Sequence, residues 1–262
     1  MDKRKDIIGS FYSGIDEDTR LGASRHGQLE YRTTMHYIHR FADFGSKILE
    51  TGAGTGRYSV ALAKEGFDVT AVELVPHNYD LLRENAEGID DLTAYQGDAV
   101  DLSRFADGEF GTVLALGPFY HLYERSEIDR ALSEAVRVTK PGGVIIAAFL
   151  SVHAIMFNNY LKDTLADGLE ENFDANWNTR HFAEQLFTGY EIEEFEKLWD
   201  DLPTKHIVTV AADGILELAE QRSDFSMTDD QFDMYALYHR HFCERRELLG
   251  ASSHLLYICR KL

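Results

Sequence analysis

The chain has 262 residues, 44% of them apolar, which is enough for one large α/β domain with a sizeable core and argues against global disorder. Its 45 acidic and 26 basic residues give a net charge of −19, which disfavours nucleic acid and anionic membranes and favours a small, neutral or cationic substrate. No run approaches the roughly 18 apolar residues of a membrane span, and two lone cysteines suggest a reducing compartment, so we expect a cytoplasmic protein.

The first 46 residues are predicted to form an N-terminal cap segment that is helical after a flexible start. Leu29, Met35, Ile38 and Phe41 fall near helical spacing, with polar residues between them. Gly45 then provides a stop signal before the next element.

From Lys47 the chain alternates between short apolar runs and helical patterns, which predicts a Rossmann-like core over residues 47–150. Predicted helices begin at Arg57, at Pro76 and at Ser126, which has capping-box spacing, and Lys140–Gly143 is a predicted turn. The predicted strands cover residues 47–51, 68–74, 92–98, 110–116 and 144–150. Such alternation predicts an α/β fold with a doubly wound, mostly parallel sheet.

After residue 150 the pattern changes. Residues 151–203 are rich in aromatic and acidic side chains and are predicted to be a helical lid insertion over the carboxyl edge of the sheet. Residues 204–262 are predicted to complete the core, with strands at 205–211 and 254–261 and helices at 214–222 and 228–248. These two strands bring the predicted sheet to seven.

A glycine-rich loop follows the first predicted strand. Glycines at 52, 54 and 56 let the backbone turn sharply and approach a ligand without a Cβ clash, although an ordinary strand–helix turn is the alternative. Glu73 ends the next strand, 21 residues after Gly52, where a carboxylate can accept hydrogen bonds from ribose hydroxyls. Arg57 stands where a dinucleotide fold would need a third glycine, which disfavours NAD.

The run Ile48–Gly56, with the sequence ILETGAGTG, resembles motif I of the class I S-adenosylmethionine-dependent methyltransferases. Later motifs of that family have counterparts in the same order, at Gln96–Ala99, Leu116–Leu122 and Ala135–Gly143. The post-strand signature at Leu116–Leu122 is similar to a bacterial, small-molecule-type branch. Thr51 departs mildly from the residue that the family usually has after the acid.

The resemblance implies that S-adenosyl-L-methionine is the cofactor and S-adenosyl-L-homocysteine the product. Glu50 would support the loop, Glu73 would bind the ribose hydroxyls with Leu74 beside the adenine, and Asp98 would meet the adenine amino group. The implied cofactor residues are Glu50, Gly52, Ala53, Gly54, Gly56, Glu73, Leu74, Asp98, Ala99 and Leu116.

The N-terminal segment offers side chains that are candidates to close over the cofactor. They are Tyr12, Arg25, His26 and Glu30, with Arg25 as a candidate partner of the methionine carboxylate. A surface helix with its loop is the alternative interpretation for each of them.

Methyl transfer from a sulfonium needs alignment of the nucleophile more than it needs protein chemistry, so catalytic residues are difficult to name. Tyr120 and His121 follow the fourth predicted strand at the edge where ligands bind. His121 is a candidate base or a residue that shapes the loop, and Tyr120 lines the pocket or packs in the core. No zinc-type spacing of Cys and His occurs, so we expect no metal.

The sequence therefore predicts a methyltransferase that acts on an O, N or S atom of a small molecule. Two alternatives stay open: methylation of a protein or tRNA, and a non-catalytic module that binds the cofactor and regulates a partner. Neither the acceptor nor the oligomeric state can be read from the sequence.

Overall fold

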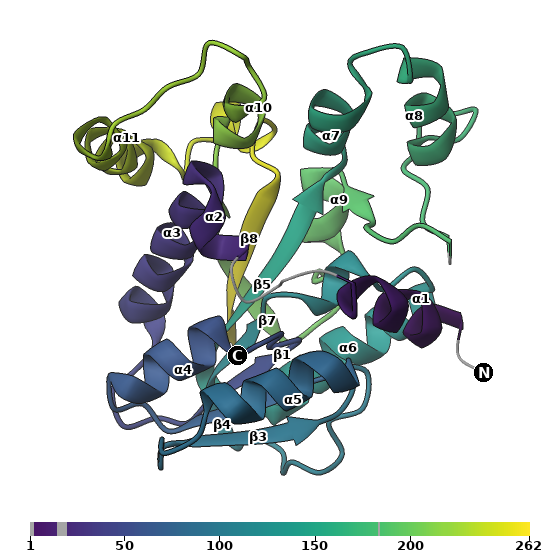
Figure 1. Cartoon of the computed structure of the whole chain (residues 1–262). Helices are drawn as coiled ribbons and strands as arrows, with labels where there is room; N and C mark the ends of the chain where they lie inside the picture. Colours follow the sequence, from purple (N-terminus) through teal and green to yellow (C-terminus); the bar gives the residue numbers. More distant parts are fainter. Residues whose placement is uncertain (1–2, 15–19, 183) are drawn as a thin grey trace.

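A computed structural model describes residues 3–14, 20–182 and 184–262, and a single twisted sheet forms its centre (Figure 1). The sheet has eight strands, seven of them in the order β3-β2-β1-β4-β5-β8-β7. Its strands are β1 (Ile48–Thr51), β2 (Val69–Glu73), β3 (Leu92–Gln96), β4 (Phe110–Ala115), β5 (Thr139–Ser151), β6 (Gly189–Tyr190), β7 (Thr204–Ala211) and β8 (His254–Lys261). The predicted mostly parallel seven-stranded sheet is confirmed, and the two-residue strand β6 is added beside β5.

Only β8 runs against its neighbours among these strands, since it pairs antiparallel with both β5 and β7. The start of β8 and the end of β7 therefore lie at the same edge as the carboxyl ends of the parallel strands. This arrangement brings residues from the last 60 positions of the chain to the edge where α/β proteins bind ligands.

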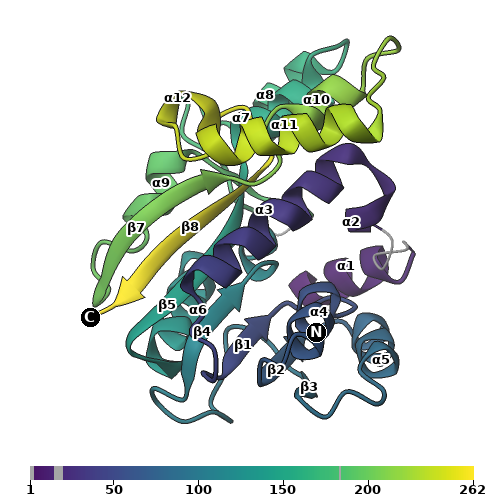
Figure 2. The same cartoon turned by 90° about the vertical axis from the view of Figure 1, so that its left-hand side faces the viewer.

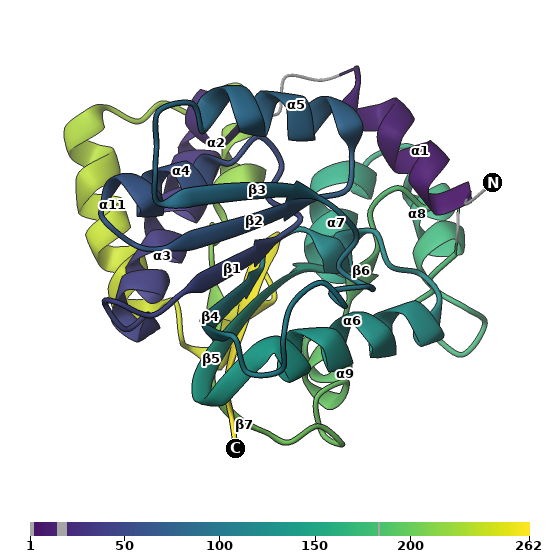
Figure 3. The same ribbon diagram turned by 90° about the horizontal axis from the view of Figure 1, so that it is seen from below.

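Helices cover both faces of the sheet (Figure 3). Helices α4 and α5 pack on β2 and β3, whereas α6 packs on β4 and β5. Right-handed crossovers explain this division, because the chain moves outward from β1 in one direction through β2 and β3 and in the other through β4 and β5. The larger helices are α1 (Lys3–Tyr12), α3 (Arg25–Phe41), α4 (Arg57–Lys64), α5 (Pro76–Asn85), α6 (Arg125–Val138), α8 (Leu165–Asn172) and α11 (Asp229–Phe242).

Helices α8 and α11 and some of the shorter helical elements lie above the carboxyl edge of the sheet, at the top of Figure 1. In Figure 2, α3 rises from the sheet to α10 and α11, and a small apolar cluster of Leu29, Leu216 and Phe232 joins the three helices. The shorter elements are α2 (Arg20–Ala23), η1 (Pro118–Tyr120), α7 (Val152–Ile155), the π-helical turn η2 (Met156–Tyr160), α9 (Ile192–Lys197), α10 (Leu216–Glu220) and α12 (Arg246–Leu249).

Several predicted boundaries are wrong, each for a local reason. Ser126 does not cap α6, because the carbonyl of Glu124 already accepts the first helical hydrogen bonds from Glu127 and Ile128. The predicted start of the chain is not flexible throughout, since α1 begins at Lys3. The long helix expected over 228–248 ends at Phe242, and α12 follows it.

The predicted turn at Lys140–Gly143 is a bulge inside β5 rather than a break before it. The ladder with β4 shifts register there, and Gly142 adopts a φ of +76°. A Cβ on Gly143 would lie 2.7 Å from the carbonyl oxygen of Gly111 on the opposing strand. Glycine therefore lets the strand continue through a segment that reads as a turn.

The segment 151–203 divides into two parts. Tyr190, Phe195 and Trp199 are buried against the sheet, where the Phe195 ring stacks on Phe149 at 4.1 Å between centroids and the Trp199 ring stacks on Tyr257 at 4.9 Å. The earlier part, which contains α7, η2 and α8, stands over the carboxyl edge (Figure 1). The number of aromatic residues alone could not show which part of the segment packs on the sheet and which part covers its carboxyl edge.

Among the described residues, no helix is both long enough and apolar enough to cross a membrane. Cys243 and Cys259 are buried free thiols.

Candidate functional site

A cavity of about 830 Å³ lies at the carboxyl edge of the sheet, next to the point where β1 and β4 are neighbours and the strand order reverses. This is where doubly wound folds bind ligands, because loops from the two half-sheets diverge there. The volume is near the upper end of the roughly 300–1,000 Å³ typical of small-molecule sites. All four predicted segments of the chain contribute to its lining.

The glycine loop forms the floor of the cavity beside β1. Gly52, Gly54 and Gly56 have φ values of +68°, +56° and +91°, a region that favours glycine. A Cβ on Gly52 would approach Pro118 Cδ to 2.9 Å, so the loop after β1 lies directly against the turn after β4. Gly52, Ala53 and Gly54 line the cavity.

Gly56 is not among the lining residues, so its predicted approach to the cofactor is not seen. Its position serves packing, because a Cβ there would meet Leu82 Cδ1 of α5 at 2.4 Å. Gly56 is also the residue before α4, and its left-handed conformation sets the direction of that helix.

Two buried carboxylates stand on either side of the loop. Glu73, at the end of β2, accepts hydrogen bonds from the backbone N–H groups of Gly54 at 2.8 Å and Val75 at 2.7 Å. Glu50, at the end of β1, is bonded by the hydroxyl of Ser59, and its complete burial raises its pKa to about 8. Glu73 thus ties the glycine loop to the next strand while facing the cavity, together with Leu74.

Asp98 and Ala99 also line the cavity, as predicted, but Asp98 already has partners. Its Oδ2 accepts from Arg4 of α1 at 2.6 Å and lies 3.1 Å from the ammonium of Lys5. Burial alone would raise the pKa of Asp98, but these two cations outweigh it and lower the pKa. The N-terminal helix is therefore anchored at the position where the adenine is expected.

His121 connects three segments of the site. Its Nδ1 lies 2.7 Å from the carbonyl oxygen of Leu186, which can only accept, so Nδ1 carries the proton. Nε2 then accepts from the hydroxyl of Tyr12 at 2.9 Å. Burial lowers the pKa of His121 to about 4. Both ring nitrogens are engaged in holding α1 and the 186 loop, which fits a loop-shaping residue better than a base.

The remaining predicted residues divide between the cavity and the surface. Tyr12, Leu116 and Tyr120 line the cavity, and so do His26 and Glu30.

Arg25 does not line the cavity, and the prediction that it reaches the cofactor is wrong for this arrangement. Its guanidinium instead donates to Asp229 at 2.6 Å and to the carbonyl of Met227 at 3.2 Å, and it lies over the ring of Phe232. The Arg25 side chain therefore holds the start of α3 against the start of α11.

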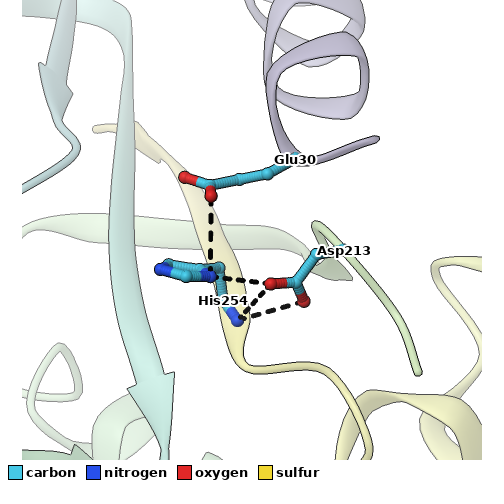
Figure 4. A group of neighbouring side chains, drawn as sticks. All are labelled: Glu30, Asp213 and His254. Carbon is cyan, nitrogen blue, oxygen red and sulfur yellow. Dashed lines mark hydrogen bonds and ion pairs between the residues drawn. The ribbon is translucent and has the colours of Figure 1, made fainter. Parts of the chain in front are cut away.

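Sequence reasoning missed a cluster on the other side of the cavity, formed by Glu30, Asp213 and His254 (Figure 4). His254 Nδ1 lies 2.7 Å from Asp213 Oδ2 and 3.6 Å from Glu30 Oε2. Asp213 has no exposed side-chain surface and also accepts from the hydroxyl of Ser252 at 2.6 Å. Burial would raise the pKa of Asp213, but His254 and these hydrogen bonds lower it, so the group is ionised at neutral pH.

A sequence signal for this cluster existed. Asp213 comes directly after the predicted strand 205–211, and His254 opens the last predicted strand. An acid at the end of a parallel strand and a histidine at the start of an antiparallel one lie at the same sheet edge. The sequence does not reveal that the last strand is antiparallel, so the two could not be paired.

The loop and its carboxylates fit a ribose-bearing cofactor. Gly52 and Gly54, whose positive φ values favour glycine, and the strand-end carboxylate of Glu73 beside them provide the close backbone approach and the hydrogen-bond acceptor that such a ligand needs.

Residues 48–143 match a family model described as a methyltransferase domain. A glycine/sarcosine N-methyltransferase from Parasynechococcus marenigrum is 34% identical over 113 residues, 42% of this chain and 40% of that protein. A demethylmenaquinone methyltransferase from Renibacterium salmoninarum is 35% identical over 107 residues, 41% of this chain and 42% of that protein. The chain thus spans about two fifths of the length of these two curated relatives.

Among solved structures, the geranyl diphosphate C-methyltransferase of Streptomyces coelicolor A3(2) superposes with a TM-score of 0.59, covering 100% of this chain and 98% of that one. That structure contains Mg²⁺, geranyl diphosphate and S-adenosyl-L-homocysteine. At 15% identity the likeness shows the shared fold.

Proposed function

We propose that this chain, whose residues 48–143 match a methyltransferase domain, is a class I S-adenosylmethionine-dependent methyltransferase that transfers the cofactor's methyl group to an O, N or S atom of a small molecule. The observation that carries the proposal is the cavity of about 830 Å³ at the β1–β4 switch point, which is lined both by the glycine loop and by a second set of polar side chains. The cofactor supplies an electrophilic methyl group on sulfur, and the protein aligns the nucleophile with it and excludes water.

One side of the cavity suits the cofactor. Gly52 and Gly54 allow close backbone approach, and the carboxylate of Glu73, held by the backbone N–H groups of Gly54 and Val75, faces the cavity as an acceptor for the ribose hydroxyls. Leu74 offers an apolar surface for the adenine. Asp98 Oδ1, the oxygen that Arg4 does not bind, accepts from the backbone N–H of Val100 at 3.3 Å and is the proposed acceptor for an adenine amino group.

The other side suits a small acceptor. It is lined by residues of α1, by His254 and by residues of the 151–203 segment, including Tyr160, Phe182 and Phe187. The names of the two curated relatives, which refer to glycine, sarcosine and a menaquinone precursor, support small acceptors. The net charge of −19 supports such acceptors over tRNA.

The proposal assigns a role to each part of the chain. Residues 47–150 bind the cofactor, residues 204–262 complete the sheet and provide one wall of the acceptor site, and residues 1–46 together with the first part of 151–203 act as its cover.

Calorimetric titration of the wild type and the Glu73→Ala variant with S-adenosylmethionine, S-adenosylhomocysteine and NAD tests the cofactor half. We expect the wild type to bind both sulfur nucleosides and not NAD. Loss of a charged hydrogen-bond acceptor, worth about 1.5–3 kcal/mol, should weaken binding in the variant by about tenfold or more.

Asp68→Ala is the matched control, because Asp68 is an exposed carboxylate at the opposite end of the same strand. Its affinity should equal that of the wild type. No binding of either sulfur nucleoside, or tighter binding of NAD, would contradict the proposal.

A further inference from the structure

Glu30 and His254 line the same cavity as the glycine loop, and the fully buried Asp213 is bonded to His254. This cluster takes no part in the proposed cofactor half of the site. We propose that His254 is the general base of the reaction, oriented by Asp213, and that the acceptor therefore enters with a proton on its nucleophilic atom, as a hydroxyl or a protonated amine. This inference rests on the proposed methyl transfer and narrows its acceptor class.

The geometry fixes the tautomer of His254. Asp213 is ionised and can only accept, so the ring nitrogen 2.7 Å from it, Nδ1, carries the proton. In the neutral ring the lone pair is then on Nε2, which points away from both carboxylates in Figure 4. A histidine held in this way by a buried carboxylate is the recurring arrangement of a general base.

Asp213 is itself rigidly held. Its Oδ1 accepts from the hydroxyl of Ser252 at 2.6 Å and from the backbone N–H of His254 at 3.2 Å. Because the carboxylate is bonded to both the ring and the backbone of the same residue, it fixes where the imidazole stands and which nitrogen is protonated. Asp213 is therefore a positioning residue.

His254 stands on the acceptor side of the cavity. It opens β8 opposite Leu150 at the end of β5, and its ring meets that of Tyr120 edge-on at 5.8 Å between centroids. Tyr120 belongs to η1, the turn whose Pro118 touches the glycine loop. One short turn thus lies between the cofactor half and the imidazole.

The other histidine near this turn is poorly suited to the role. Both nitrogens of His121 hold structural partners, Leu186 and Tyr12, and the ring is buried. His254 lines the cavity, as His121 does, but it lies beside a buried, ionised carboxylate that can orient its ring.

The step balances without a further reagent. A hydroxyl loses its proton to His254 Nε2 as its oxygen bonds to the methyl carbon, whereas a protonated amine loses its proton to Nε2 first, which frees the nitrogen lone pair for attack. In both cases the electrons of the breaking carbon–sulfur bond return to sulfur. The imidazolium that results is stabilised by Asp213 and by Glu30 Oε2, 3.6 Å from Nδ1. The proton is later released to water.

The test compares wild type, His254→Gln and the surface control His39→Gln in their production of S-adenosylhomocysteine from catechol, tyramine, benzylamine and thiophenol. His39 is a surface residue that bonds Glu65, outside the cavity lining. We expect His254→Gln to lower kcat for the first three acceptors by about a hundredfold or more. Thiophenol, already a thiolate at about pH 8, should react at an unchanged rate.

Two readouts do not depend on turnover. The Kd for S-adenosylmethionine of His254→Gln should stay within about twofold of the wild-type value. Nitrogen NMR should show His254 protonated at Nδ1 in the wild type and a mixture of tautomers in Asp213→Asn, with Asp213→Glu partly restoring the wild-type signal. Added imidazole should restore part of the lost rate in His254→Ala.

The outcomes separate the two claims. Failure of the wild type to bind S-adenosylmethionine overturns the proposed function itself. If binding is normal, the base assignment is overturned by an equal loss with thiophenol, by no turnover of catechol, tyramine or benzylamine, or by an Nε2–H tautomer. Activity that EDTA abolishes and Mn²⁺ restores would overturn it in favour of a metal ion held by the same three residues.

Discussion

At the scale of single residues, two buried acids of the site have pKa values that are shifted in opposite directions. Glu50 is buried without a cation, and its pKa rises to about 8. Asp98 is also buried, but Arg4 and Lys5 lower its pKa. Composition and spacing cannot distinguish these cases, because the difference comes from a helix almost 100 positions away in the chain.

The raised pKa of Glu50 predicts that the free energy of unfolding decreases as the pH rises. The folded pKa of about 8 lies above the unfolded value of about 4.5, so between these values the folded state binds a proton that the unfolded state lacks. The free energy of unfolding should therefore decrease by a few kcal/mol from about pH 5 to pH 8. Glu50→Gln should flatten this dependence in urea unfolding.

Glu84→Gln, a substitution of an exposed glutamate on α5, is the control and should keep the wild-type slope. An equal slope in wild type and Glu50→Gln would show that Glu50 is ionised in the folded protein.

At the scale of elements, α1 depends on tertiary contacts for its position. Its own sequence shows little amphipathic pattern, but both of its ends are fastened: Arg4 pairs with Asp98 at 2.6 Å and with Glu127 at 3.3 Å, and Tyr12 bonds His121. The edge-on contact of Phe11 with Phe187 joins it to the 151–203 segment. These contacts explain why a segment expected to be flexible is a helix over the cavity.

Arg4→Met should release α1. Removing one partner of a buried ion pair costs about 3–5 kcal/mol, because it leaves a buried charge behind. Amide hydrogen exchange should then be at least about tenfold faster over residues 3–12 and unchanged in the sheet. Arg125→Met, which breaks the exposed pair with Asp129, should leave exchange in α1 at the wild-type rate. If α1 exchanged as slowly in Arg4→Met as in the wild type, the aromatic contacts alone would be enough to hold the helix in place.

At the scale of the whole molecule, the cavity connects all four segments, so a ligand there should stabilise the fold as a unit. S-adenosylmethionine at a hundredfold excess over its Kd adds about 2.7 kcal/mol. For a chain of this size the Tm should rise by roughly 5–10 °C. Scanning calorimetry should show no shift with NAD at the same concentration and a reduced shift in Glu73→Ala.

The architecture and the residues around the glycine loop could be predicted from the sequence, because the signals for them are local. Apolar alternation and the glycine spacing act locally, so the strands from Ile48 to Ser151 lie near their predicted places. The loop at 52–56 turns toward the cavity, as its glycines require. Glu50, Glu73 and Asp98 stand at strand ends because the strands themselves place them there.

The other features of the site depend on contacts between distant parts of the chain, which the sequence does not reveal. The antiparallel direction of β8, the anchoring of α1 through Arg4 and the diversion of Arg25 to Asp229 are pairings between residues about 90 to 200 positions apart. Asp213, His254 and Glu30 come together only when the end of β7, the start of β8 and α3 are folded against one another. Periodicity and spacing describe neighbours along the chain, whereas ion pairs and hydrogen bonds across the fold are selected by packing, and the acceptor half of this site is built from them.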